Sequence, residues 1–144
     1  MPKSTSTCNS ILALIFNATA WADLAENDAS SPVTDLYVSL HTSDPGVGGS
    51  QTTNEAAYTN YARVAVARTT SGWAAPSGGA TSNAALIQFP QCGVTGATVT
   101  HVAIGKASSG TGLVLYAGAL NSSLAVANLI QPQFATGDLD VAET

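Results

Sequence analysis

The sequence is poor in charged side chains and poorest in basic ones. Asp, Glu, Lys and Arg make up 9% of its 144 residues, against roughly 25% in an average globular protein. Only four residues are basic, namely Lys3, Arg63, Arg68 and Lys106, and the net charge is −5. A surface with so few cations cannot neutralise a run of phosphates, which excludes nucleic-acid binding through a basic patch.

The low charge does not indicate a disordered chain. Disorder needs low hydrophobicity together with high charge, whereas 45% of these residues are apolar. A single domain of this length buries about 68–70% of the surface that its unfolded chain exposes, which is enough for a core. Two explanations of the missing charge stay open. The protein has a neutral surface rich in Ser and Thr, or neighbouring subunits cover much of that surface, since interface cores are depleted in charge.

Cysteine is also scarce, which limits covalent and metal cross-links. Cys8 and Cys92 lie far apart in the sequence, and neither belongs to a CxxC pair or to a metal-ligand spacing. We expect two free thiols rather than a disulfide, as suits a protein assembled in a reducing cytoplasm.

The motifs of the common catalytic and nucleotide-binding sites are missing as well. There is no GxSxG, GxGxxG, GxxxxGK[ST] or calcium-loop pattern. His41 precedes Asp44 by three positions, but a catalytic triad is defined in space, so we predict that His41 and His101 are structural. Asp138 and Asp140 lack a third nearby carboxylate, so we predict solvated charges at a sheet edge. The sequence therefore predicts no enzyme, no cofactor and no metal site.

The N-terminal segment imitates a secretory signal. An apolar run at residues 11–16 follows Lys3, and Ala18-Thr19-Ala20 resembles a cleavage site. The run is shorter than a usual signal core and far too short to cross a membrane. We predict instead a helix that Asn9 or Ser10 caps and that reaches about Glu26.

The apolar stripe of this predicted helix has two possible roles. Its members recur at steps of three and four residues; they are Ile11, Leu14, Ile15, Ala18, Trp21, Ala22 and Ala25. The stripe either packs on the protein's own β-domain or docks on a neighbouring subunit. Ile11 and Leu14 are therefore interface candidates.

The rest of the chain has the pattern of short strands separated by turns. Residues 36–41 alternate between apolar and polar side chains and end in a turn, where Asp44 can bond its own downstream backbone and Gly46 can adopt a positive φ. Further strands are predicted at 61–69, 84–89, 97–105 and 113–120, with short ones at 124–127, 133–134 and 139–141.

Strands at a spacing of about ten residues favour a mainly β fold. We predict an antiparallel β-sandwich or a jelly-roll-like barrel with an N-terminal α-helix. In this division residues 1–32 are a helical segment packed on, or docking from, the β-domain. Residues 33–144 form a single β-sandwich domain.

Several segments of the β region carry a resemblance to a known family. They include LYVSLHTSDPG at 36–46, TNYARV at 59–64, SGW at 71–73 and LYAGAL at 115–120. From about Val33 onward, the sequence resembles small virion proteins of tailed bacteriophages, which are often labelled tail fibre or hypothetical protein. This resemblance brings no catalytic motif, so no catalytic residue can be carried over from it.

The resemblance implies a structural protein of the virion, assembled in the cytoplasm of the bacterial host. The preferred role is capsid cement or decoration, at the capsid surface. There the protein would bind the major capsid protein and copies of itself, as a dimer or trimer, and neither nucleic acid nor membrane. The alternatives are a tail, fibre-adaptor or baseplate component, or a host-receptor or carbohydrate-binding module. Trp21 and Trp73 join Ile11 and Leu14 as interface candidates, because tryptophan is enriched at interface hot spots, although burial in the core explains either equally well.

Overall fold

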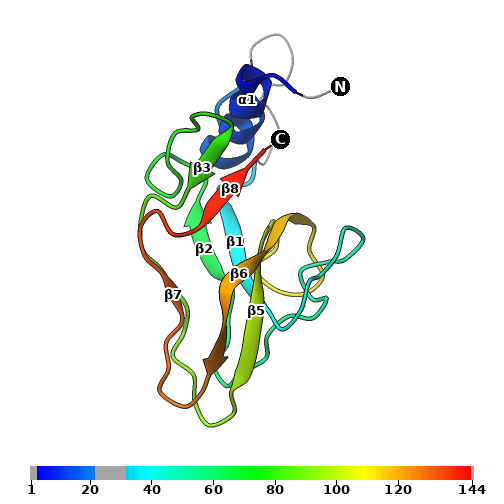
Figure 1. Cartoon of the computed structure of the whole chain (residues 1–144), viewed down its shortest axis with the longest axis vertical. Coiled ribbons are helices and arrows are strands. Elements are labelled where there is room, and N and C mark those ends of the chain that lie inside the picture. Colours follow the sequence, from blue (N-terminus) through cyan, green and yellow to red (C-terminus); the bar gives the residue numbers. More distant parts are fainter. Residues whose placement is uncertain (1–2, 22–31, 144) are drawn as a thin grey trace. The chain divides into compact units, whose positions relative to one another are not determined.

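A computed structural model describes residues 3–21 and 32–143, and within them the fold is mainly β with one N-terminal helix. The strands form a four-stranded sheet in the order β2-β1-β5-β6, and two pairs of short strands, β3-β8 and β4-β7. Figure 1 labels the four strands of the sheet and the pair β3-β8. The pairings β1–β5, β5–β6 and β3–β8 are antiparallel. These observations confirm the predicted fold class, except that the described strands do not close into a barrel.

The chain forms two compact units, each built from separate stretches of sequence. Unit 1 consists of Met1–Asp35, Val66–Ile87 and Phe134–Thr144. Unit 2 consists of Leu36–Ala65 and Gln88–Gln133. The division into a helical segment at 1–32 and one β-sandwich domain at 33–144 stays a prediction.

Unit 1 contains the helix α1, Thr5–Asn17. It begins at Ser4, whose side-chain oxygen accepts a hydrogen bond from the Thr7 N–H at 3.1 Å, a typical N-cap. It ends where Ala18 adopts a left-handed conformation with φ 53°, which closes the last turn.

The predicted bounds of this helix were wrong at both ends. The helix begins after the N-cap Ser4, several residues before Asn9 and Ser10, so its first turns consist mainly of polar residues. Ala18 ends it well before Glu26, and the helical pattern predicted for residues 18–21 does not form a helix. The remaining part of that prediction, residues 22–26, lies outside the described residues.

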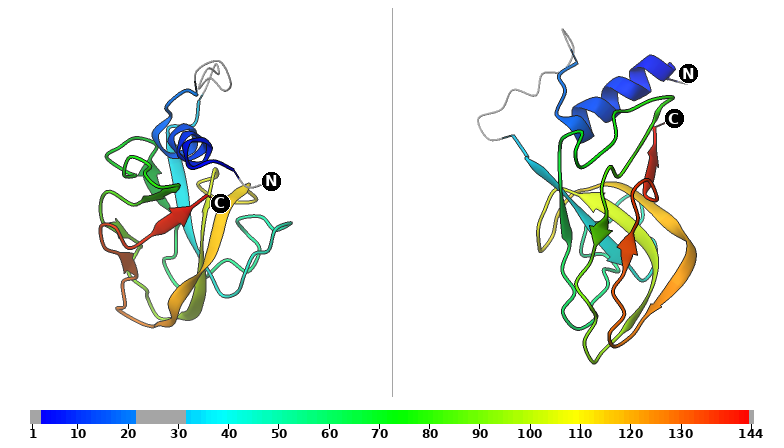
Figure 2. Two further views of the ribbon diagram at one scale, coloured as in Figure 1. Left: turned by 45° about the horizontal axis from the view of Figure 1, so that its top comes forward. Right: turned by 90° about the vertical axis from the view of Figure 1, so that its left-hand side faces the viewer.

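The core of unit 1 is built on one face of α1. Leu12 and Phe16, four residues apart on the helix, are fully buried, and so is Trp73. The rings of Phe16 and Trp73 meet edge to face, with centroids 4.7 Å apart. Figure 2 (right) shows α1 and the short strand β3, Ala80–Ser82, whose partner is β8, Asp140–Ala142.

Arg68 closes the C-terminal end of α1. Its guanidinium donates hydrogen bonds of 2.5 Å to the carbonyls of Leu14 and Ile15, and of 2.7 Å to that of Val33. The last carbonyls of a helix have no partner within the helix, and a cation there also interacts favourably with the helix dipole. Burial lowers the pKa of Arg68 from its ordinary value.

The four-stranded sheet has β1, Asp35–His41, and β5, Ala97–Gly105, at its centre. Both strands match their predictions. Their register runs from Tyr37 opposite Gly105 to His41 opposite His101. Turn formation after β1 also follows the prediction, because the Gly46 N–H donates to the Asp44 carboxylate at 2.8 Å and Gly46 has φ 72°.

The edges of this sheet differ from the prediction. β2, Val64–Ala67, is shorter than the predicted strand at 61–69, and β6, Val114–Val126, is longer than the one at 113–120. Within β6 the register shifts, because Val99 pairs with Leu124 whereas His101 pairs with Ala119. Residues 120–123 therefore lie opposite Thr100 alone, and a second irregularity leaves Leu115 unpaired with β5 between the pairs Ile104–Tyr116 and Gly105–Val114.

The remaining short strands were harder to predict. β4, Ile87–Gln88, is a fragment of the strand predicted at 84–89, and β7, Gln133–Phe134, matches its predicted position. β3 was not predicted. A buried amide organises the chain next to it, because Asn83 donates to the carbonyls of Ala85 and Ala135, each at 2.8 Å.

Candidate functional site

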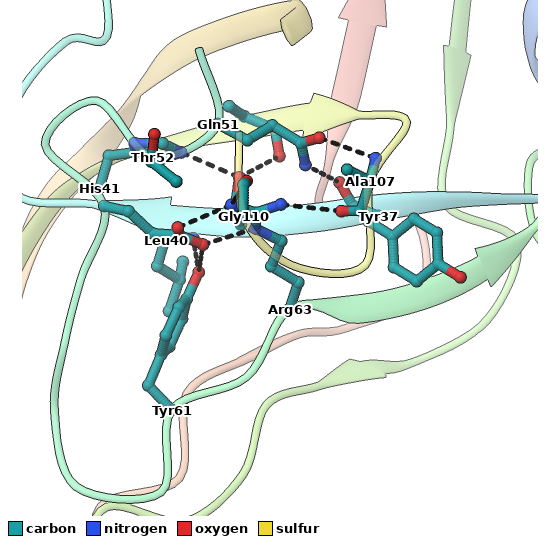
Figure 3. Close-up of polar contacts among 12 residues, drawn as sticks. Tyr37, Leu40, His41, Gln51, Thr52, Tyr61, Arg63, Ala107 and Gly110 are labelled. Carbon is teal, nitrogen blue, oxygen red and sulfur yellow. Dashed lines mark hydrogen bonds and ion pairs between the residues drawn. The ribbon is translucent and has the colours of Figure 1, made fainter. Parts of the chain in front are cut away.

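The largest group of interacting polar side chains in unit 2 gathers around β1 and two loops, at residues 50–63 and 106–112 (Figure 3). We call His41, Gln51, Glu55, Tyr61 and Arg63 the β1 cluster. His41 and Gln51 are completely buried, and the Arg63 side chain is 2% exposed. Such a concentration of buried polar groups makes this the first place to look for chemistry.

An ion pair between Glu55 and Arg63 forms the centre of the β1 cluster. Arg63 Nε lies 2.6 Å from Glu55 Oε1, and Nη2 lies 2.8 Å from Oε2, so the contact is bidentate. The guanidinium also donates to the carbonyls of Ala107 at 2.9 Å and Gly110 at 2.8 Å. Hydrogen bonds to Glu55 raise the pKa of Arg63 further above its ordinary value. This bidentate contact requires the planar, forked donors of an arginine side chain, which lysine lacks.

Tyr61 connects this ion pair to β1. Its hydroxyl donates to Glu55 Oε1 at 3.0 Å and accepts the Leu40 N–H at 3.0 Å. Burial strongly raises the pKa of Tyr61. The ring stacks on Phe89 and meets Tyr58 edge to face, and burial raises the pKa of Tyr58 to about 12.

His41 is held by a hydrogen bond on each ring nitrogen. The Thr53 carbonyl lies 2.9 Å from Nδ1 and can only accept, so Nδ1 carries the proton. Nε2 then accepts from the Ser39 hydroxyl at 2.9 Å. Burial lowers the pKa of His41, which keeps the ring neutral.

The Ser39–His41 contact resembles half of a hydrolytic site, but its surroundings do not. Both residues are 0% exposed, so no substrate atom can reach the serine oxygen. The Asp44 carboxylate, which the sequence places near His41, accepts the Gly46 N–H in its own turn. The pair therefore fixes β1 to the loop that carries Thr53, as predicted for a structural histidine.

Gln51 ties the second loop to the β1 cluster. Its Oε1 accepts the Ala107 N–H at 2.9 Å, and its backbone N–H donates to the Gly112 carbonyl at 2.9 Å. A Cβ atom on Gly112 would lie 2.2 Å from Gln51 Oε1, so only glycine allows this close approach. The polar groups of the β1 cluster thus bond to one another and to the loops, and they hold these loops in place.

The described residues show neither a metal-binding cluster nor a membrane-spanning helix. Among residues 3–21 and 32–143, no group of three or more His, Cys, Asp or Glu side chains is arranged to hold a metal ion. Asp138 and Asp140 are exposed on either side of the buried Leu139. No helix in this part of the chain has the length and apolarity needed to cross a membrane. Cys8 and Cys92 are free, as predicted, and both are buried.

The four interface candidates differ in exposure. Trp73 is 0% exposed and packs on Phe16 within unit 1, where its Nε1–H has no hydrogen-bond partner among the described groups. Ile11, Leu14 and Trp21 are each partly exposed.

Sequence reasoning missed the β1 cluster and predicted for Arg63 only that it lies in a strand at 61–69. Arg63 is instead buried, because Glu55 and two loop carbonyls supply its partners. One feature of the sequence could have indicated the ion pair: Glu55 and Arg63 lie eight positions apart in a chain with almost no other charge nearby.

Comparison with known proteins gives one family. A family model described as Podophage GP4 fiber I protein gp80 matches residues 2–142. No curated protein matches the chain.

Proposed function

The chain belongs to the Podophage GP4 fiber I protein gp80 family, and from this premise we propose that it is a structural part of the fibre or tail apparatus of a tailed bacteriophage. The family match spans residues 2–142 and is the observation that carries the proposal. It confirms the resemblance to phage virion proteins that begins with LYVSLHTSDPG at residues 36–46.

The family description favours one of the roles weighed from the sequence over another. A fibre family supports the tail, fibre-adaptor or baseplate role, which stood second to capsid cement. Cement at the capsid surface, bound to the major capsid protein, has no comparable support. We therefore place the protein in the virion, at the tail rather than on the shell.

The geometry supports action through contact area instead of a reactive centre. The side chains of the β1 cluster hydrogen-bond to one another and to loop backbone groups, which supports a role in holding the loops in shape. Large apolar side chains are exposed in unit 2; they include Val94 at 88%, Leu113 at 61% and Leu129 at 68%. We propose that its partners are proteins, namely copies of itself and neighbouring virion proteins.

Copy number in the purified virion tests the proposal. Quantitative mass spectrometry should find far fewer copies of this protein than of the major capsid protein, and immunogold labelling should mark the tail. Near-equal copies and label over the whole shell would instead establish the cement role and overturn the proposal. The protein's absence from gradient-purified particles would remove both roles.

A further inference from the structure

The two histidines of the chain lie directly opposite each other in the sheet of unit 2. His41 on β1 and His101 on β5 are register partners in an antiparallel pairing, so their side chains lie on the same face. Cβ atoms of such partners are about 4.5–5.5 Å apart. Residues 42–54 follow His41, and we call them the Val47 loop because they carry this fully exposed side chain.

Each histidine is tied to one end of the Val47 loop. His41 Nδ1 donates to the Thr53 carbonyl at 2.9 Å, near the end of the loop. At its beginning, the Thr100 hydroxyl donates to the Thr42 carbonyl at 2.9 Å. A hydroxyl has one proton to donate, so the Thr100 oxygen accepts from His101 Nδ1 at 2.8 Å. His41 thus holds the loop directly, and His101 holds it through Thr100.

The hydrogen bonds of His41 permit either protonation state. In the neutral ring, Nε2 accepts from the Ser39 hydroxyl at 2.9 Å. When Nε2 gains a proton, the Ser39 oxygen can accept from it, and the Ser39 proton can turn to the Ala103 carbonyl, 3.4 Å away. Burial and charge therefore decide whether the ring stays neutral.

The surroundings of His41 oppose a positive charge. The ring has no exposed surface, so water cannot hydrate it. Among the described residues, the charged or titratable groups that face it are Glu55, Arg63 and His101. Both oxygens of the Glu55 carboxylate already accept from Arg63, so this ion pair offers little net attraction. Tyr61, beside the ion pair, stays neutral because burial raises its pKa. A proton on His101 adds a like charge directly opposite His41.

We propose that His41 and His101 form an acid-sensitive latch, which holds the Val47 loop on the sheet at neutral pH and releases it when the two rings become protonated. Opening of the loop breaks the contacts to Thr42 and Thr53 and brings water to His41. The open form therefore accepts a proton that the closed form resists, so a fall in pH shifts the equilibrium toward the open form. The inference follows from the fold of unit 2 and holds wherever in the virion the protein lies.

Hydrogen exchange followed by mass spectrometry measures the opening of the loop. The reporters are the N–H groups of Thr42, Gln51 and Ala56, each of which donates to a backbone carbonyl at 2.8–2.9 Å. Dividing each exchange rate by the rate of the unfolded chain at the same pH gives the opening equilibrium.

The expected change follows from the titration of one ring. A histidine that has an ordinary pKa of about 6.5 in the open form and stays neutral in the closed form raises the opening equilibrium about tenfold between pH 7.5 and pH 5.5. Carboxyl groups of ordinary pKa, about 4, stay ionised over this range. We therefore expect a rise of about tenfold at the three reporters of the wild type, and no comparable rise at residues 74–83 of unit 1.

Two glutamine variants separate the latch from a general sensitivity to acid. His41→Gln cannot take up the proton and should remove most of the rise. His101→Gln removes only the second charge, so its rise should be smaller than that of the wild type but still present. His101 is partly exposed, so this variant should fold and keeps the test decisive if His41→Gln does not fold. A wild-type rise below twofold, a wild-type-sized rise in either variant, or an equal rise at residues 74–83 overturns the proposal.

Discussion

Replacing Glu55 by Gln should destabilise the protein far more than a typical loop substitution. The change keeps the shape of the side chain and removes its charge, while the Arg63 guanidinium stays in place at 2% exposure. Both carboxylate oxygens now accept from Arg63, at 2.6 and 2.8 Å. A glutamine offers one oxygen, and its amide NH₂ then faces donors on Arg63.

The size of the effect follows from the burial of the arginine. Removing one partner of a buried ion pair costs about 3–5 kcal/mol, because the other charge is left buried without compensation. The carbonyls of Ala107 and Gly110 still accept from Arg63, and Glu55 itself is 16% exposed, so the lower end of this range applies. We expect a loss of about 3 kcal/mol, which corresponds to a fall in melting temperature of roughly 10 °C.

Urea unfolding followed by tryptophan fluorescence measures this loss. Asp138→Asn removes an exposed carboxylate and is the control, with an expected change within about 0.5 kcal/mol. In a double-mutant cycle, Arg63→Met combined with Glu55→Gln should cost about 2 kcal/mol less than the sum of the single changes. A Glu55→Gln loss below about 1 kcal/mol, or additive single changes, would refute a central role for the ion pair.

Three further changes test other parts of the fold. Burial lowers the pKa of His41, so as the pH falls the unfolded chain takes up a proton on this ring before the folded chain does. The urea midpoint of the wild type should therefore fall as the pH drops below about 6.5, and His41→Gln should reduce that fall. Trp73→Ala should cost about 3–5 kcal/mol in thermal unfolding. Trp73→Phe should cost clearly less, since the Nε1–H that it removes has no partner in the described structure; equal losses would contradict this. Gly112→Ala should lower the urea midpoint because its Cβ would lie 2.2 Å from Gln51 Oε1, and an unchanged midpoint would show that the loop moves freely.

The sequence predicted best the strands along which apolar and polar side chains alternate. Apolar and polar side chains alternate along much of β1 and β5, and both strands formed where this pattern placed them, although both faces are buried at 38–41 and 102–105. The start of α1 was missed because Asn9 and Ser10 directly precede the apolar run and hide the true cap at Ser4. The local sequence pattern alone does not show which of two possible N-cap residues begins the helix.

Features that depend on distant contacts escaped prediction. The burial of Arg63 requires Glu55 and the carbonyls of Ala107 and Gly110. These two carbonyls lie more than 40 positions after Arg63 in the sequence. The extension of β6 past residue 120 depends on a register shift against β5, and periodicity cannot show a shift between two strands. Trp73 was left between core and interface, and only its contact with Phe16 shows where it packs.

The internal use of arginine has a practical consequence. The Arg63 guanidinium is buried against Glu55 and two loop carbonyls. By contrast, Lys3 and Lys106 are exposed, and Lys3 lies 2.7 Å from Glu143. An arginine-selective dicarbonyl reagent should therefore spare Arg63 in intact molecules and label it once unit 2 opens. Mass-spectrometric counting of that adduct would report on opening of the loops without any engineered probe.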